Sequence, residues 1–308
     1  MTANAIPVRR ARIAIFGPFA AGMIGAALIA AGVAGLVIHR SSHVTRAVTS
    51  PATVSLPPAT IGLPRTMNQV VPTAGLFGLL TANGALSTPG DPELGQSKGA
   101  HAGTFVGAVT NFDGGVWLVT DRGQVIGVHA QVLGSLPQGA NASPVVGIAP
   151  AAYGHGYRLL TRDGHVHAFG APKRIGVARF HPTSAVVGIA PAAHDGYWVT
   201  LANGHVYAIN APDLGSAKLA PNAAPVVGIA SSVDGRGYRL VTADGQVYAF
   251  GLPAPYPSAT NFSGHVVGIA SAPNRGYWLA TDDGHTYGFG TSPVPTSTKG
   301  RVIAIFAN

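Results

Sequence analysis

The chain has 308 residues, of which 10% are charged and none is cysteine, so disulfides and thiol chemistry are excluded. Its formal net charge is +8, but residues 1–90 contain six arginines and no acidic residue. The rest of the chain is close to neutral, with 13 basic against 11 acidic residues. A basic face that neutralises phosphates is therefore not expected on the main domain, and nucleic acid is not an expected partner.

The N-terminal region predicts a membrane anchor. Residues 1–12 form a basic segment that is expected to be cytoplasmic, and the 26 residues from 13 to 38 carry no charge. As a helix this stretch is roughly 39 Å long, enough to cross a ~30 Å hydrocarbon core with some tilt. The flanking arginines favour a cytoplasmic N-terminus. We therefore expect a single-pass protein of the cell membrane, with the main domain on the extracytoplasmic side.

Two further interpretations concern this apolar segment. The alternative to an anchor is a cleaved signal peptide with Gly32-Val33-Ala34 as its cleavage site, although the apolar run continues past that point. Small residues also recur every four positions on one helix face, at Gly22, Ala26, Ala30 and Ala34. This spacing allows a helix-mediated homodimer. An Ala- and Gly-rich composition explains the same spacing without a dimer.

Residues 39–72 predict a flexible linker. They contain five prolines among many serines and threonines, and no acidic residue. A flexible chain of about thirty residues spans roughly 30 Å, and prolines extend it further. This length is sufficient to hold the following domain clear of the membrane surface.

From residue 73 the sequence repeats about every forty residues. A turn glycine recurs 39 to 41 residues apart, at Gly84, Gly123, Gly164, Gly204, Gly245 and Gly284. In the copy at 226–251, three short runs rich in β-branched and aromatic residues predict three antiparallel strands. The Asp244-Gly245 pair predicts a type I′ hairpin turn, which needs positive φ. The repeat units are expected near 75–104, 105–144, 145–185, 186–225, 226–265 and 266–301.

Six such units predict an all-β domain at residues 73–308, a six-bladed β-propeller. One small sheet cannot bury both of its faces, but sheets stacked around an axis bury them for each other. The first strand pattern is missing from the first copy and is found instead at 302–306, so this strand is expected to close the ring. A solenoid is the alternative, but it needs atypical capping repeats.

Any fourth, outer strand has to come from the Pro- and Ala-rich segment that follows each unit. The best traces of such a strand are Leu133-Gly134-Ser135 and Leu214-Gly215-Ser216. These two tripeptides occupy corresponding places in two of the copies. We therefore expect the blades to have three or four strands.

The repeat pattern is Val-Val-Gly-Ile-Ala, Gly-Tyr-Trp/Arg-Leu, Asp-Gly and Val-Tyr-Ala-Phe-Gly, and it covers about residues 75–308. It resembles tandem repeats of exported, envelope-associated actinobacterial proteins. A weaker likeness exists to the repeats of the regulator of chromosome condensation family, whose outer Asn-x-x-Gly-Gln-Leu-Gly motif is absent here. The resemblance implies a propeller and an extracytoplasmic location, and it transfers no catalytic residue.

The residue after the turn glycine is histidine in three copies, at His165, His205 and His285. These positions belong to different blades, too far apart to share one ion at bonds of about 2 Å. His167 lies two residues beyond His165 on the same strand face and would need further ligands from elsewhere. We therefore expect no metal site, and no sequence motif indicates a cofactor.

A second row lies at the start of the predicted middle strands, and it holds Phe77, Trp117, Arg158, Trp198, Arg239 and Trp278. The first interpretation is packing between blades, with each arginine lying on a neighbouring tryptophan. The second is a face of stacking platforms with hydrogen-bond donors between them, suited to sugars or peptides. On this second interpretation Trp117, Arg158, Trp198, Arg239 and Trp278 are the candidate ligand-binding residues.

The acidic residues do not form a catalytic pattern. Several lie in predicted turns or, like Asp113, Asp195 and Asp234, in loops where a carboxylate accepts hydrogen bonds from local backbone N–H groups. Neither paired carboxylates nor a serine-nucleophile or zinc-protease motif is present. We expect a non-enzymatic binding or scaffold propeller that contacts a protein partner or a cell-wall glycan. The alternative is a propeller hydrolase or lyase acting on an envelope carbohydrate.

Overall fold

The computed structural model describes residues 77–89, 91–97, 100–137, 139, 142–151, 154–170, 181–257, 261–292, 298 and 300–307. The chain divides into two units, Met1–Pro64 and Arg65–Asn308, and all described residues belong to the second. The predicted basic segment 1–12, membrane helix 13–38 and linker 39–72 lie outside the described residues. Within the described part, no helix is long and apolar enough to span a membrane.

The described residues form nineteen β-strands in six antiparallel sheets. Sheet 1 has the strand order β19-β1-β2-β3, and sheets 2 to 6 each hold three consecutive strands. The strands are β1 (Phe77–Thr81), β2 (Ala85–Thr88) and β3 (Asp91–Gln96) with β19 (Val302–Ala307) in sheet 1; β4 (Phe105–Thr110), β5 (Val116–Thr120) and β6 (Val125–Val128) in sheet 2; β7 (Val145–Pro150), β8 (Tyr157–Thr161) and β9 (Val166–Phe169) in sheet 3; β10 (Val186–Pro191), β11 (Tyr197–Leu201) and β12 (Val206–Ile209) in sheet 4; β13 (Val226–Ser231), β14 (Tyr238–Thr242) and β15 (Val247–Phe250) in sheet 5; and β16 (Val266–Ser271), β17 (Tyr277–Thr281) and β18 (Thr286–Phe289) in sheet 6.

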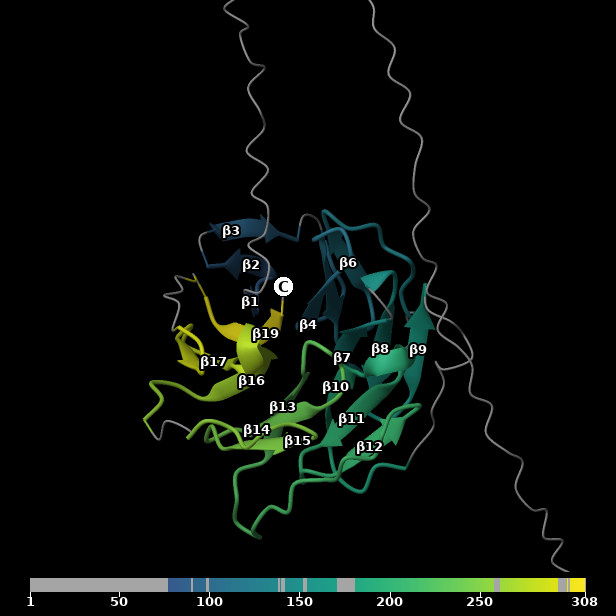
Figure 1. The fold of residues 1–308 in the computed structure, drawn as a ribbon. Coiled ribbons are helices and arrows are strands. Elements are labelled where there is room, and N and C mark those ends of the chain that lie inside the picture. Colours follow the sequence, from purple (N-terminus) through teal and green to yellow (C-terminus); the bar gives the residue numbers. More distant parts are fainter. Residues whose placement is uncertain are drawn as a thin grey trace, which may run out of the picture. The chain divides into compact units, whose positions relative to one another are not determined.

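The sheets lie around a common centre, with one strand of each innermost (Figure 1). Each innermost strand contacts those of both neighbouring sheets, in the series β4, β7, β10, β13, β16 and β19, which returns to β4. Where the series returns, Thr110 Oγ1 donates a hydrogen bond of 3.2 Å to the Ala307 carbonyl. The fold is therefore all-β and propeller-like, as the repeat pattern predicts.

The C-terminal strand completes the first sheet. β19 pairs antiparallel with β1, and the register joins Phe77 to Ala307 and Leu80 to Ala304. The repeat pattern predicts this pairing, because the first copy lacks the strand pattern that residues 302–306 carry. The strand also contributes buried side chains, since Val302 and Phe306 are 0% and 6% exposed.

The glycine of the innermost strands is required by close packing around the centre. A Cβ added to Gly188 would lie 3.0 Å from Ile229 Cγ2 of the next sheet, and one added to Gly107 would lie 3.1 Å from Ile148 Cγ2. Each glycine thus makes room for the isoleucine of its neighbour. This contact explains why the repeat keeps glycine and isoleucine side by side in the Val-Val-Gly-Ile pattern.

The hairpin turns differ from the predicted type I′. Gly245 has φ +85°, but Asp244 is not among the residues with positive φ. The Gly245 N–H donates to the Thr242 carbonyl at 2.9 Å, and the Thr242 hydroxyl donates to the Asp244 carboxylate. A type I turn followed by a left-handed glycine needs positive φ at the glycine alone. The aspartate serves the turn through its side chain, and the type I′ prediction is wrong.

The predicted outer strand is absent from sheets 2 and 4 in the described residues. The segment after β6 instead follows that strand as an irregular chain, in which Ser135 Oγ accepts from the Val125 N–H at 2.9 Å. Ser216 Oγ accepts from the Val206 N–H at 3.0 Å in the corresponding place of sheet 4. A serine hydroxyl thus satisfies an edge N–H that a fourth strand would otherwise bind. Only sheet 1, among the described sheets, has a fourth strand, β3.

Deleting residues 301–308 is predicted to destabilise the domain by at least about 4 kcal/mol, because it exposes one edge of β1 and removes buried aliphatic and aromatic side chains. Urea unfolding followed by tryptophan fluorescence measures the change. Deleting residue 308 alone is the control and should leave the unfolding midpoint unchanged. A truncated domain with the midpoint of the full chain would contradict the role of β19.

Candidate functional site

The central axis is lined by small and aliphatic side chains. Two cavities of about 160 Å³ lie along it, one bounded by the N-terminal halves of the innermost strands and one by their C-terminal halves. Ile148, Ile189 and Ile229 line both cavities, and neither is lined by an ionisable side chain. Among the described residues, groups suited to acid–base chemistry therefore do not converge on the axis.

The five predicted site residues are buried between neighbouring sheets. Trp117, Arg158, Trp198, Arg239 and Trp278 are at most 3% exposed. Each lies on the first residue of the middle strand in the next sheet. Trp117 packs against Tyr157 with ring centroids 4.8 Å apart, and Trp198 packs against Tyr238 at 4.9 Å. These contacts agree with the first interpretation of the row, packing between sheets. The five side chains do not form an exposed row of platforms.

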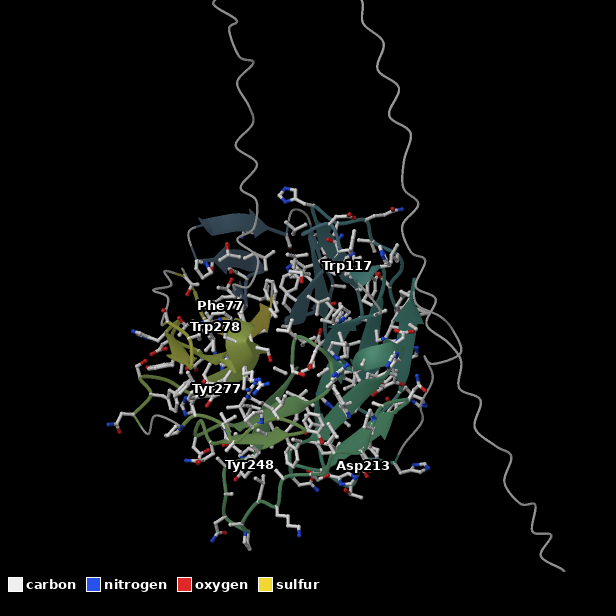
Figure 2. The ribbon with its side chains drawn as sticks, in the orientation of Figure 1. Phe77, Trp117, Asp213, Tyr248, Tyr277 and Trp278 are labelled. Atoms are coloured by element: carbon white, nitrogen blue, oxygen red, sulfur yellow. The ribbon has the colours of Figure 1, made fainter. Side chains whose placement is uncertain are left out.

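Two details of the predicted row are wrong. The arginines lie on tyrosines rather than on tryptophans, with Arg158 Cζ 5.2 Å from the centre of the Tyr197 ring. Phe77 occupies the tyrosine position of its sheet, where it packs on Trp278 at 5.0 Å (Figure 2). The tryptophan position of sheet 1 is Gly78. A Cβ there would overlap the ring of Phe306, so the C-terminal strand supplies the missing aromatic group.

The Trp and Tyr side chains also hold the segments outside the sheets. Trp117 Nε1 donates to the Gln131 carbonyl at 2.8 Å, and Trp198 Nε1 donates to the Pro212 carbonyl at 2.9 Å. The Tyr157 hydroxyl, from the neighbouring sheet, donates to the Gly134 carbonyl at 2.5 Å. Each tryptophan contact therefore links two sheets and the irregular segment between them through buried polar groups that are satisfied.

Arg158 makes a buried ion pair with the next sheet. Its Nη2 lies 2.5 Å from Asp195 Oδ1 and 3.1 Å from the Asp195 carbonyl oxygen. The two side chains are 1% and 10% exposed. Asp195 follows the left-handed His194 in the short 3₁₀ turn η3 (Ala193–Asp195), with φ values of 56° and 64°. The sequence predicts that the Asp195 carboxylate accepts from local backbone N–H groups. The structure adds an ion pair between this carboxylate and an arginine 37 residues earlier, which the sequence does not predict.

Arg239 occupies the same place in sheet 5 but has a different neighbour. Its guanidinium lies 5.2 Å from the centre of the Tyr277 ring, and its Nη2 donates to the Arg275 carbonyl at 2.6 Å. Arg275 stands two residues before Tyr277, as Asp195 stands two residues before Tyr197. Its turn η4 (Pro273–Arg275) repeats the left-handed backbone, with φ 59° at Asn274 and 66° at Arg275. The backbone contact is kept, but the carboxylate is replaced by a second guanidinium.

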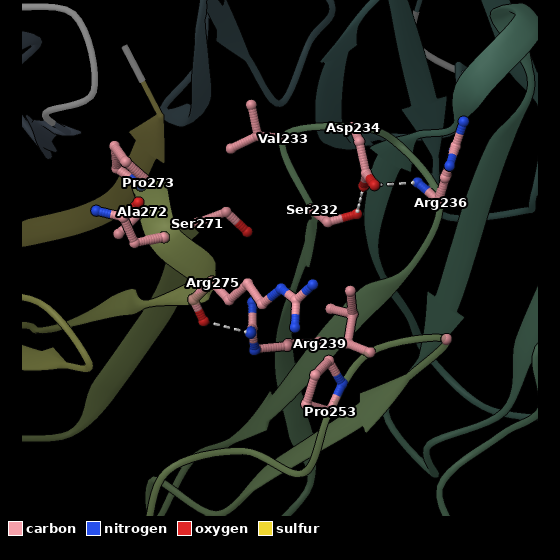
Figure 3. A pocket seen from close by; sticks show the side chains of 13 residues that line it. Ser232, Val233, Asp234, Arg236, Arg239, Pro253, Ser271, Ala272, Pro273 and Arg275 are labelled. Atoms are coloured by element: carbon pink, nitrogen blue, oxygen red, sulfur yellow. Dashed lines mark hydrogen bonds between the residues drawn. The ribbon is translucent and has the colours of Figure 1, made fainter.

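A cavity of about 800 Å³ opens beside Arg239, between sheets 5 and 6 (Figure 3). It is lined by the β13–β14 loop, the residues after β15 and the β16–β17 turn. Its charged residues are Asp234, Arg236, Arg239 and Arg275. Apolar side chains at its wall and mouth are Val233, Leu252, Pro253 and Pro273. This is the candidate functional site, and of the five predicted residues only Arg239 lines it.

The charges of this cavity are unevenly satisfied. Asp234 Oδ1 accepts from Ser232 Oγ at 2.6 Å and from the Arg236 N–H at 3.2 Å, and the hydroxyl contact lowers the pKa of Asp234. Burial lowers the pKa of the Arg239 guanidinium below its usual value. Burial also raises the pKa of Tyr277 to about 12, so its hydroxyl is neutral at pH 7. The buried guanidinium of Arg239 thus has a neutral tyrosine ring and a backbone carbonyl as its neighbours.

The repeated histidines lie at separate turns. His165 Nδ1 is 2.7 Å from Asp163 Oδ2, and His285 Nδ1 is 3.1 Å from Asp283 Oδ1, each within its own turn. The rings of His165 and His167 have centroids 6.4 Å apart. Over the described residues, no three His, Asp or Glu side chains come together in a group that could hold a metal ion.

Sequence reasoning missed Arg275 and Arg236 as site residues. The available signal was the residue two positions before the tyrosine, which is Asp195 in one copy and Arg275 in another. That difference indicates a site only when it is known that each sheet packs on the arginine of the preceding sheet. The sequence alone places these residues in separate repeats.

No protein-family model and no curated protein matches this chain. Among solved structures, it is similar to a protein of unknown function from Bacteroides caccae, with a TM-score of 0.53 and 11% identity over 76% of this chain and 98% of that one. A structure of U3-55K is 16% identical with a TM-score of 0.47, and the match spans 62% of each chain. At such identities the first likeness supports the fold alone.

Replacing Trp198 with alanine is predicted to destabilise the domain by about 3–5 kcal/mol, because it removes a fully buried indole and its hydrogen bond to Pro212. Chemical denaturation followed by circular dichroism measures the loss. Val233→Ala, at an 82% exposed side chain, is the control and should change stability by less than about 0.5 kcal/mol. Equal stability of the Trp198 variant and the wild type would contradict the buried contact.

Replacing Asp195 with alanine is predicted to cost about 3–5 kcal/mol, because Arg158 would keep a buried charge without its partner. The same denaturation experiment measures the change. The double variant Arg158→Met, Asp195→Ala should recover most of the loss, since it removes both charges. A single variant as stable as the wild type would show that the ion pair contributes nothing.

Proposed function

We propose that this chain is a six-bladed β-propeller, closed by its C-terminal strand, that binds a protein partner or a cell-wall glycan outside the cytoplasm. The proposal includes the predicted single-pass anchor at 13–38 and membership of the actinobacterial envelope-associated repeat family. The contacts of β19 with both β1 and β4 support closure of the ring. The uncharged segment 13–38, followed by a proline-rich linker, supports an anchored and exported domain.

The observation that carries the binding role is the distribution of polar groups. Among the described residues, no ionisable side chain lines the axial cavities, whereas arginines and one aspartate gather in the 800 Å³ cavity that loops of sheets 5 and 6 line. A cavity of this size with a few convergent polar groups and apolar walls is typical of a ligand site. It accepts part of a chain, such as a sugar unit or a peptide segment.

The enzymatic alternative, a hydrolase or lyase, has less support. General acid–base chemistry needs two titratable groups within reach of the reacting bond. Asp234 is the one carboxylate that lines the cavity among the residues that the structure describes, and it accepts hydrogen bonds from its own loop. The other charged groups there are arginines, which bind and orient anions and do not exchange protons near pH 7.

The test is co-sedimentation of residues 73–308 with purified actinobacterial cell wall, before and after protease treatment of the wall. We expect wild-type protein in the pellet, and loss of binding after protease treatment identifies a protein partner. Arg236→Ala, at the mouth of the cavity, should weaken retention about 3- to 10-fold by removing a charged contact. Arg162→Ala removes an exposed arginine from sheet 3 and should bind as the wild type does. Wild-type protein that stays in the supernatant in both arms would contradict the proposal.

A second measurement tests the anchor. The full chain, expressed in an actinobacterial host, is expected to stay in the membrane fraction after carbonate extraction and to be degraded by protease added outside the cell. A mature N-terminus near residue 35 and a soluble product would show a cleaved signal peptide instead.

A further inference from the structure

The repeat provides an internal comparison for Arg239. Arg158 and Arg239 stand at equivalent positions, lie 5.2 Å from equivalent tyrosine rings, and donate through Nη2 to the carbonyl of equivalent residues. The difference lies in the side chain of that residue, which is Asp195 in one case and Arg275 in the other. Arg158 therefore has a carboxylate at 2.5 Å, and Arg239 has none in the corresponding place.

The missing charge is not supplied from elsewhere in the described structure. Arg239 is 3% exposed, and no carboxylate in the described ranges lies within ion-pair distance of it. Asp234 is the one acid among the described residues that lines the cavity, and its carboxylate accepts hydrogen bonds from Ser232 and Arg236 of its own loop (Figure 3). A buried cation without a counter-ion is costly, because burial removes its hydration.

The arginines near Arg239 add to the positive charge around the cavity. Arg275 and Arg236 are exposed and line the same cavity, so three guanidinium groups and one carboxylate surround the space. Guanidinium groups bind the oxygens of carboxylates and phosphates through charge-assisted hydrogen bonds. A site of this composition favours a negatively charged group in the place that Asp195 fills between sheets 3 and 4.

We propose that the cavity between sheets 5 and 6 binds an oxyanion group of a larger ligand, with Arg239 as its buried cation and Arg275 and Arg236 at its entrance. The ligand's carboxylate or phosphate takes the structural place of the Asp195 carboxylate. The remaining volume and the apolar surfaces of Val233, Leu252 and Pro273 contact the uncharged part of the ligand. The inference rests on the proposed binding role and adds the chemistry of the recognised group.

The test uses thermal unfolding of the full-length chain in detergent, followed by the fluorescence of its three tryptophans, which all lie between sheets. Inorganic phosphate and sodium acetate are titrated separately at pH 7, with sodium chloride at matched ionic strength as reference. We expect a saturable rise in melting temperature of about 3 °C at tenfold excess over the dissociation constant. The larger response of the two names the group, phosphate or carboxylate.

Three variants separate specific binding from the general stabilisation that phosphate gives to proteins. Arg239→Met should lower the anion affinity about 10- to 100-fold, because the buried donor is lost. Arg275→Asp restores the arrangement of Arg158 and Asp195, so its melting temperature without anion should equal or exceed that of the wild type, and the anion response should disappear. Arg162→Gln removes an exposed charge from sheet 3 and should respond as the wild type does.

Two results would overturn the proposal. One is a wild-type melting temperature that follows ionic strength alone in both titrations. The other is an anion response in Arg239→Met and Arg275→Asp as large as in the wild type. If either result is found and the protein still co-sediments with the cell wall, the oxyanion site is contradicted and the proposed binding role stands. If the anion response is found but the protein does not co-sediment with the cell wall, the oxyanion site is supported and the proposed partner is contradicted.

Discussion

The structure depends on one contact that recurs between the sheets. At five of the six described junctions, a side chain from one middle strand lies on the aromatic ring that begins the next middle strand. The sheets have three strands in most copies, too few to bury two faces alone. Trp117 on Tyr157, Trp198 on Tyr238 and Trp278 on Phe77 fill three of these spaces with ring pairs. Such pairs contribute about 0.5–1.5 kcal/mol beyond the area they bury. Each of the six buried clusters combines side chains of two neighbouring sheets, so the inter-sheet contacts make up most of the core.

Tryptophan and arginine alternate in this contact, and the positions differ in how their polar groups are satisfied. The tryptophans satisfy their N–H groups on the segments outside the sheets, and Arg158 satisfies its charge on Asp195. Arg239 keeps the geometry and lacks the counter-charge, because Arg275 replaces the aspartate. The candidate site thus arises from one substitution within a repeated packing unit, next to loops that leave a cavity open.

Much of the fold could be predicted from the sequence, because the turn glycine and the Val-Val-Gly-Ile pattern repeat with little variation. The site could be predicted only in part. Arg239 belonged to a row that periodicity reveals, but its partners come from the next repeat and depend on how the sheets face each other. The sequence pattern aligns Phe77 one position out of register, because Gly78 gives no aromatic signal and the aromatic group there is Phe306, more than 200 residues away. Ser135 and Ser216 gave no sign that a hydroxyl replaces a fourth strand.

If the inter-sheet contacts are the core, the middle strands should open together and not sheet by sheet. Native-state hydrogen exchange of the full-length chain at increasing denaturant measures this directly. The amides of Leu118, Leu159, Val199, Leu240 and Leu279, all fully buried, should converge on one opening free energy equal to that of global unfolding. Separate opening energies for individual sheets, with some well below the global value, would show that the sheets are stable one by one and would contradict this account.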